Sequence, residues 1–162
     1  MRAVVHGAVS IEVGGVDGAD ADGSGADAAG ALALADGIWW TFPALPVHAR
    51  LARGWLTGWL GTQYPCKEER AYGATVAFSE LVTNAVLHGA GPITVYARLD
   101  ERRLLCEVTD RSVELPRLLG AGPDNEHHRG LSLVAMLATS WSVRATAEGG
   151  KTIAFTVDLD EG

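Results

Sequence analysis

The sequence predicts an α/β two-layer sandwich, in which a mixed, mostly antiparallel sheet carries its helices on one face. Three observations predict it. Late in the chain, β-prone segments come in two pairs, each joined by a short polar turn as in antiparallel hairpins. Longer stretches before and between these pairs carry apolar residues at helical spacing, and a β-prone run precedes them all. A sheet with helices gathered on one side buries the apolar faces of both.

The first half of the ordered chain is predicted as a strand followed by two helices. The strand is a run of Ile, Trp and Phe at 38–42 that stops at Pro43. Apolar residues at helical spacing predict a helix over 47–60. After a charged loop over 62–70, a central helix begins at about 68 or 71 and runs to 87, where glycines close it.

The second half is predicted as strand, strand, helix, strand, strand. These elements are expected at 93–99, 104–109, 130–138, 140–147 and 152–159. Residues 111–129 show no sustained period and contain two prolines and two glycines. A loop of this length inside a compact domain is usually functional or mobile, so we expect a lid.

The chain divides into two parts at about residue 37. Residues 13–37 are mostly Gly, Ala and Asp, with no aromatic residue and no Lys or Arg. Such a segment buries too little surface to offset the entropy of ordering it. We expect residues 1–37 to form a flexible acidic leader, which could hold a short strand within 3–13, and residues 38–160 to form one domain.

Composition excludes several classes of protein. The 162 residues are 48% hydrophobic, which suits one packed domain, and their formal net charge of −7 disfavours a nucleic-acid partner. No run of about 18 apolar residues predicts a membrane span, and the start does not resemble a signal peptide, so a cytoplasmic protein is expected. Cys66 and Cys106 are too few for a disulfide framework or a zinc site and are expected to be buried thiols.

Three polar residues share one stripe of the central helix. Glu80, Asn84 and His88 lie at i, i+4 and i+8, while Leu81 and Ala85 would face a core. Polar groups beside a buried surface cost roughly 1–3 kcal/mol each when unsatisfied. The stripe is therefore either a binding face or the solvated margin of an amphipathic helix.

Two further features complete a candidate site. Asp110 ends a strand and could accept a hydrogen bond from an exocyclic amine such as that of adenine. Arg129 and Gly130 open a helix, where backbone N–H groups and the helix dipole favour phosphate. Asn84 offers a neutral oxygen suited to Mg²⁺, and Glu80 is placed to orient or deprotonate a hydroxyl or water near a terminal phosphate.

These residues resemble motifs of the GHKL ATPase superfamily. Residues 80–85, Glu-Leu-Val-Thr-Asn-Ala, resemble its N box, and Asp110 with the residues after it is similar to a shortened G1 box. Residues 128–134 resemble the G2 box, and 149–152 the last hairpin. The resemblance runs from about residue 39 to 159 and is closest to small actinobacterial ATP-binding regulators related to anti-sigma-factor serine kinases.

The resemblance implies the Bergerat fold, with ATP and Mg²⁺ bound between the central helix and the lid. It implies that Glu80 is the general base, Asn84 the Mg²⁺ ligand and Asp110 the adenine reader, and that Gly130 with Leu131 forms the phosphate-contacting turn. His88 either approaches the phosphates or caps the helix. The expected nucleotide contacts are Asn84, His88, Asp110, Ser112, Arg129, Gly130, Leu131 and Thr152.

One departure from the superfamily pattern concerns the residues after Asp110. The fuller G1 pattern is D-x-G-x-G, whereas here Asp110 is followed by Arg111, Ser112, Val113 and Glu114. The loss of both glycines raises the steric cost of any backbone position there with positive φ.

The resemblance also implies a function and partners. It implies an ATP-binding regulatory protein of the anti-sigma-factor serine/threonine kinase type, which phosphorylates a STAS-domain antagonist. Its partners would be a sigma factor, that antagonist or both, and a homodimer is compatible with related regulators. Two alternatives stay open: a non-catalytic module that docks a partner in a nucleotide-dependent way, and a stand-alone ATPase. The carboxylate of Glu80 favours the kinase, because a module that only binds needs no base there.

Overall fold

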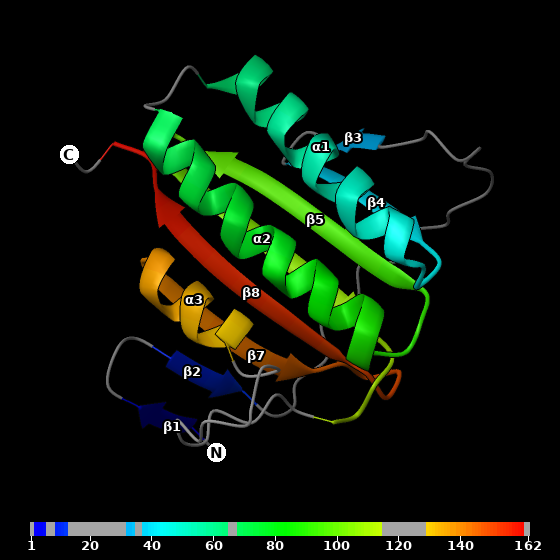
Figure 1. The fold of residues 1–162 in the computed structure, drawn as a ribbon. Coiled ribbons are helices and arrows are strands. Elements are labelled where there is room, and N and C mark those ends of the chain that lie inside the picture. Colours follow the sequence, from blue (N-terminus) through cyan, green and yellow to red (C-terminus); the bar gives the residue numbers. More distant parts are fainter. Residues whose placement is uncertain are drawn as a thin grey trace.

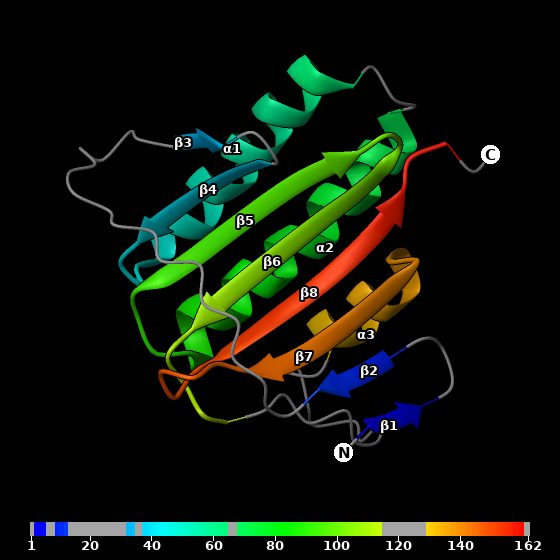
Figure 2. The same cartoon turned by 180° about the vertical axis from the view of Figure 1, so that it is seen from behind.

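The computed structural model describes residues 2–5, 9–12, 32–34, 37–64, 68–114 and 129–160. These residues form one eight-stranded sheet and three helices. All three helices pack on the same face of the sheet (Figure 1), and no helix of the described chain covers the opposite face (Figure 2). The predicted two-layer sandwich, with a mixed and mostly antiparallel sheet, is confirmed.

The sheet mixes neighbouring and distant segments of the chain. Its strands, in sequence order, are β1 (Arg2–Val5), β2 (Val9–Glu12), β3 (Leu32–Leu34), β4 (Gly37–Phe42), β5 (Ile93–Asp100), β6 (Arg103–Asp110), β7 (Ser140–Ala145) and β8 (Lys151–Asp158). Their spatial order is β1-β2-β7-β8-β6-β5-β4-β3. Every neighbouring pair is antiparallel except β2 and β7.

Both predicted hairpins are present. The turn between β5 and β6 includes Glu101 at a φ of 53°, and the turn between β7 and β8 includes Gly149 at a φ of 82°. Strand β8, the last of the described strands in sequence order, lies between β7 and β6 in the middle of the sheet. This pairing places Lys151 of β8 directly opposite Asp110 of β6.

The three helices are α1 (Pro46–Gln63), α2 (Glu68–His88) and α3 (Arg129–Leu137). The central helix α2 and the short helix α3 have the predicted positions. Helix α1 extends past its expected end at residue 60. The N–H of Tyr64 donates to the carbonyl of Leu60 at 3.0 Å, and the hydroxyl of Thr62 donates to the carbonyl of Trp59 at 2.7 Å, so the last turn is satisfied beyond the glycine at 61.

The core lies between the sheet and the helices. Alternate strand residues such as Val95, Cys106 and Phe155 are buried on the helix side, as the period of two along a strand requires. Helix α2 contributes Phe78 and Leu81, both fully buried. Helix α2 packs against α1, α3 and the sheet, so it is the central element of the helical layer.

Three strands fall within the segment that composition assigned to a flexible leader. Strands β1 and β2 pair with each other, β2 joins the sheet beside β7, and β3 pairs with β4. The sheet therefore draws on residues before the predicted boundary at 38. Residues 13–31 lie outside the described residues, so the flexibility of the leader stays a prediction. No helix of the described chain combines the length and apolarity that crossing a bilayer requires.

Candidate functional site

The glutamate and asparagine of α2 lie against the first turn of α3. Glu80 and Asn84 are half-buried and one helical turn apart, so they share a face of α2. A Cβ placed on Gly130 would lie 2.9 Å from Oε2 of Glu80 and 3.0 Å from Nδ2 of Asn84. The backbone of α3 therefore approaches both side chains so closely that only glycine fits between them without displacing one.

The close contact at Gly130 places the N-terminus of α3 beside the side chains of Glu80 and Asn84. The first N–H groups of an α-helix have no partner within the helix, and the helix dipole adds partial positive charge there. Leu131 follows Gly130, and its side chain is 5% exposed and part of the core, so only its backbone is available to a ligand. The arrangement combines backbone donors, an amide and a carboxylate at one point, which suits an anion and a proton transfer. The side chain of Arg129 lies outside the described part of the chain.

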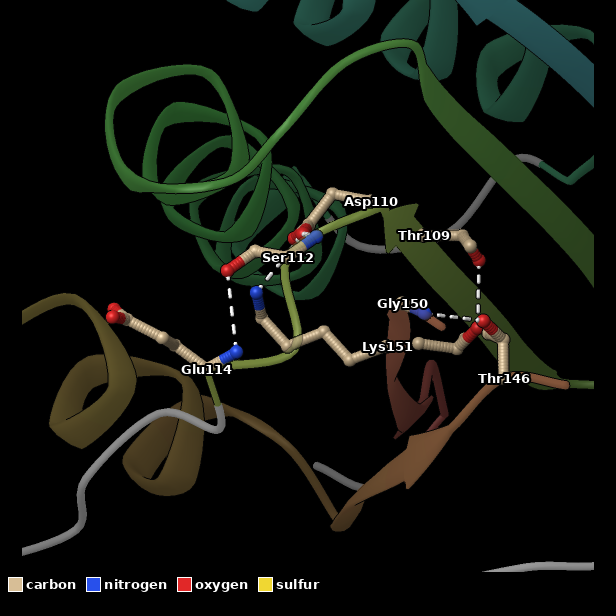
Figure 3. A network of polar contacts seen from close by, with 8 residues as sticks. Thr109, Asp110, Ser112, Glu114, Thr146, Gly150 and Lys151 are labelled. Atoms are coloured by element: carbon tan, nitrogen blue, oxygen red, sulfur yellow. Dashed lines mark hydrogen bonds and ion pairs between the residues drawn. The ribbon is translucent and has the colours of Figure 1, made fainter. Parts of the chain in front are cut away.

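Asp110 occupies the end of β6 on the helix side of the sheet. It is only 3% exposed. Its Oδ1 accepts hydrogen bonds from the Lys151 ammonium at 3.0 Å and from the backbone N–H of Ser112 at 2.7 Å (Figure 3). A Cβ on Gly89, which follows α2, would lie 2.8 Å from the Asp110 Cγ. The carboxylate is thus held between the end of the central helix and the start of the last strand.

Side chains build the turn after Asp110 that glycines build in the fuller superfamily pattern. Asp110 accepts the Ser112 N–H, and the hydroxyl of Ser112 in turn accepts the N–H of Glu114 at 3.3 Å, two consecutive side-chain turns. None of the described residues 111–114 has positive φ. Arg111 also donates its N–H to the carbonyl of Ala90 at 2.8 Å. The absence of glycines therefore causes no left-handed backbone strain at residues 111–114.

The cluster of Glu80, Asn84 and Gly130 lies near Asp110 along the C-terminal half of α2. Asn84 faces Gly130, and Gly89, five residues further along the chain, faces Asp110. At the rise of an α-helix, five residues span about 7.5 Å. The structure thus brings Glu80, Asn84 and Gly130 together and sets Asp110 with Ser112 a short distance beyond. His88 is exposed in the last turn of α2, where a basic side chain also suits the helix dipole, and neither of its two expected roles is tested.

Thr152, one of the expected nucleotide contacts, faces away from Asp110 in the described fold, and its role as a contact stays a prediction. Its hydroxyl bonds to that of Thr109 at 2.7 Å. Thr109 precedes Asp110 on β6, and successive strand residues face opposite sides, so this threonine pair lies on the face away from the helices. Lys151 takes the position facing Asp110. Lys151 lies two and four residues before the buried Ile153 and Phe155, so the period of two along a strand puts all three on one face. This spacing was the sequence signal that could have identified Lys151.

The cysteine prediction can be checked at one of its two positions. Cys106 is a free thiol on the buried side of β6, and burial raises its pKa well above the usual range. This confirms that Cys106 is a buried thiol. Cys66 lies outside the described residues. The described chain contains no group of three or more His, Cys, Asp or Glu side chains placed to hold a metal ion.

A separate cavity of about 660 Å³ lies at the other end of the β5–β6 hairpin. It is lined by Asp100, Glu101, Arg102, Arg103, Asp158 and Asp160. Two ion pairs, Arg102 with Asp160 and Arg103 with Asp158, engage both of its cationic side chains. The cavity lies at the opposite end of the strands from Asp110. Because both of its cations are already paired, we interpret it as solvated surface.

Comparison with known proteins identifies the family of the fold. The family model described as histidine kinase-like ATPase domain matches residues 42–157, more than half of the chain. A search of curated proteins gives no match. Among solved structures, the chain is similar to the crystal structure of the RsbU and RsbW domains of Rv1364c from Mycobacterium tuberculosis, with a TM-score of 0.59 and 25% identity.

The aligned region covers 76% of this chain and 32% of that one, so the present chain spans about a third of the solved chain. An ATPase domain implies nucleotide binding, and the resemblance to GHKL ATPases and anti-sigma-factor-like regulators is confirmed. The chain belongs to the family of histidine kinase-like ATPase domains.

Proposed function

We propose that this chain is an anti-sigma-factor-type serine/threonine kinase, which transfers the γ-phosphoryl group of ATP to a STAS-domain antagonist in the cytoplasm. One observation carries the proposal: the backbone of Gly130 approaches Glu80 and Asn84 so closely that a Cβ would contact both. A carboxylate and an amide facing a helix N-terminus suit phosphoryl transfer better than passive binding of an anion, because an anion alone has no use for a second negative charge.

Each residue then has a distinct role in the transfer. The hydroxyl oxygen of the partner's serine or threonine bonds to the γ-phosphorus while the carboxylate of Glu80 accepts the hydroxyl proton. The bond from the γ-phosphorus to the β–γ bridging oxygen breaks, and ADP leaves with that oxygen. The backbone at Gly130 and Leu131 holds the phosphate oxygens. Asp110 lies at the far end of the site, where the purine is expected, and Ser112 fixes its carboxylate through a backbone N–H.

The donor set suits Mg²⁺. Asn84 is the one protein ligand that we assign, and Mg²⁺ characteristically keeps several waters and takes other oxygens from nucleotide phosphates. A cage of three carboxylates or histidines is therefore not required, and the described residues hold none. When bound, the ion neutralises the charge that develops on the phosphate oxygens.

The similarity to a protein with RsbU and RsbW domains supports the partners that we propose. A sigma factor, a STAS-domain antagonist or both are the expected partners, and a homodimer is the expected assembly. Since this chain spans only part of the solved chain, these assignments rest on the site and on the family rather than on the whole protein.

The test is transfer of label from [γ-³²P]ATP to the STAS-domain proteins of the source organism, each purified and tested in turn. Labelled antagonist is the expected result, and Glu80→Gln should reduce the rate of labelling by about 10²–10⁴-fold. The matched control is Glu107→Gln, because Glu107 is a carboxylate on the opposite face of the sheet, paired with Arg144 at 2.9 Å. The control should label the antagonist at the wild-type rate.

Other results would replace the kinase with one of the alternatives. Tight ATP binding without label on any STAS-domain protein, in wild type and in Glu80→Gln alike, would indicate a non-catalytic docking module. Release of inorganic phosphate without a protein substrate, lost in Glu80→Gln, would indicate a stand-alone ATPase.

A further inference from the structure

Lys151 and Asp110 form a buried ion pair at the end of the site where the purine is expected. Lys151 Nζ lies 3.0 Å from Asp110 Oδ1, and the two side chains are 9% and 3% exposed. The β6–β8 register sets the pair, because the two residues are directly opposite each other. The absence of a side chain at Gly150 allows the backbones of β6 and β8 to approach closely there, since a Cβ on Gly150 would overlap the carbonyl oxygen of Asp110. Figure 3 shows the lysine side chain extended toward the aspartate.

The pair leaves hydrogen-bonding capacity unused. Oδ1 of Asp110 already accepts from Lys151 and from the Ser112 N–H, while Oδ2 has no hydrogen-bond partner among the described residues. A lysine ammonium carries three protons. In the described chain only Asp110 accepts one of them. Buried donors and acceptors are seldom left unmatched, so the pair presents an acceptor and a donor side by side to a ligand.

We propose that Lys151 is a base-reading residue, which donates a hydrogen bond to N1 of adenine while Oδ2 of Asp110 accepts one from the 6-amino group. The inference rests on the proposed nucleotide site. The edge of adenine carries a donor at the amine next to an acceptor at N1, the complement of what the ion pair offers. Gly89 keeps the Oδ2 side free of a side chain, because a Cβ there would lie 3.0 Å from that oxygen.

A purely structural ion pair would behave differently. If Lys151 only tied β8 to β6, the affinity for a nucleotide would not depend on whether the base has a nitrogen at position 1. The sensitive measurement is therefore a change in the ligand rather than in the protein, and it needs no variant that could unfold.

The test is calorimetric titration of the full chain, with Mg²⁺, by ATP, 1-deaza-ATP and 7-deaza-ATP. We expect 1-deaza-ATP to bind at least about tenfold more weakly than ATP, because a hydrogen bond from a charged donor is among the stronger ones. The matched control, 7-deaza-ATP, should bind as ATP does. Equal affinity for ATP and 1-deaza-ATP would overturn the role of Lys151 and leave the nucleotide site standing. Failure of all three to bind would overturn the proposed function itself.

Variants supply the second arm. Lys151→Met should bind ATP and 1-deaza-ATP equally, at the level of 1-deaza-ATP with the wild type. Because this change leaves a buried carboxylate without its cation, the double variant Lys151→Met with Asp110→Asn removes both charges, and it too should show no preference. The control is Arg144→Met, which removes a cation from the opposite face and should keep the full preference. A tenfold preference that survives in either Lys151 variant would refute the proposal.

Discussion

Replacement of Gly130 by alanine would separate the stability of the fold from the chemistry of the site. The added Cβ would lie 2.9 Å from Oε2 of Glu80 and 3.0 Å from Nδ2 of Asn84, whereas non-bonded heavy atoms pack at about 3.5 Å or more. Both side-chain ends must therefore move by roughly half an ångström. They are the far ends of flexible side chains, so the movement costs little folding free energy.

The expected effects on stability and on function have opposite signs. Alanine favours a helix over glycine by roughly 0.5–1 kcal/mol in a helix interior, and less near an end. We expect the melting temperature to stay the same or rise slightly. The affinity for ATP with Mg²⁺ and the rate of phosphoryl transfer should fall by about ten- to a hundredfold, since misplacement of a catalytic group by about 1 Å can cost about 10²-fold.

Thermal unfolding and calorimetric titration with ATP and Mg²⁺ measure the two quantities on the same sample. Gly54→Ala is the matched control, because Gly54 lies within α1 and a Cβ there would have nothing within 4 Å. It should raise the melting temperature and leave ATP binding unchanged. If Gly130→Ala bound ATP and transferred phosphate as the wild type does, the proposed roles of Glu80 and Asn84 would be refuted.

Three substitutions and one alkylation experiment test separate parts of the structure. Asn84→Ala should abolish Mg²⁺-dependent ATP binding while circular dichroism stays native, and unchanged affinity in a titration would reject the metal ligand. Asp110→Asn should weaken the preference for ATP over GTP in competition binding, and lower the free energy of unfolding in denaturant by about 3–5 kcal/mol because Lys151 loses its counter-charge. Thr152→Val should cost about 1 kcal/mol in the same denaturant assay and spare ATP affinity, and a loss of affinity would return Thr152 to the site. The raised pKa of Cys106 predicts negligible alkylation of the native protein at pH 8.5, with the other cysteine replaced by serine; rapid labelling before denaturant is added would contradict its burial.

The helices and hairpins could be predicted because their signals are local. The polar turn at 100–103 lies between two alternating runs, and it specified the β5–β6 hairpin without reference to the rest of the chain. The apolar period of α2 likewise placed Glu80 and Asn84 on one face. Their approach to Gly130 followed from the resemblance to known motifs, because no local pattern states which helix packs against which.

The structure differs from the sequence-based expectations where pairing between distant segments determines the arrangement. Whether Lys151 or Thr152 faces the site depends on the register between β8 and β6, which a motif of four residues does not specify. Strands β2 and β3 were not predicted as parts of the sheet because the composition around them resembles that of a disordered segment. Their pairing depends on the neighbouring strands β7 and β4 and is not evident from their own sequences. The predicted lid over 111–129 lies mostly outside the described residues and stays a prediction.

The position of β8 has a consequence for biosynthesis. The lysine that we assign to the purine end of the site opens β8, and β8 is inserted between two strands that precede it in the sequence. A nascent chain still lacking β8 would hold Asp110 without its cation and, if Lys151 reads the base as proposed, would bind nucleotide more weakly. Nucleotide stabilises only molecules able to bind it, so it would protect chains that contain β8 from proteolysis more than chains that lack it.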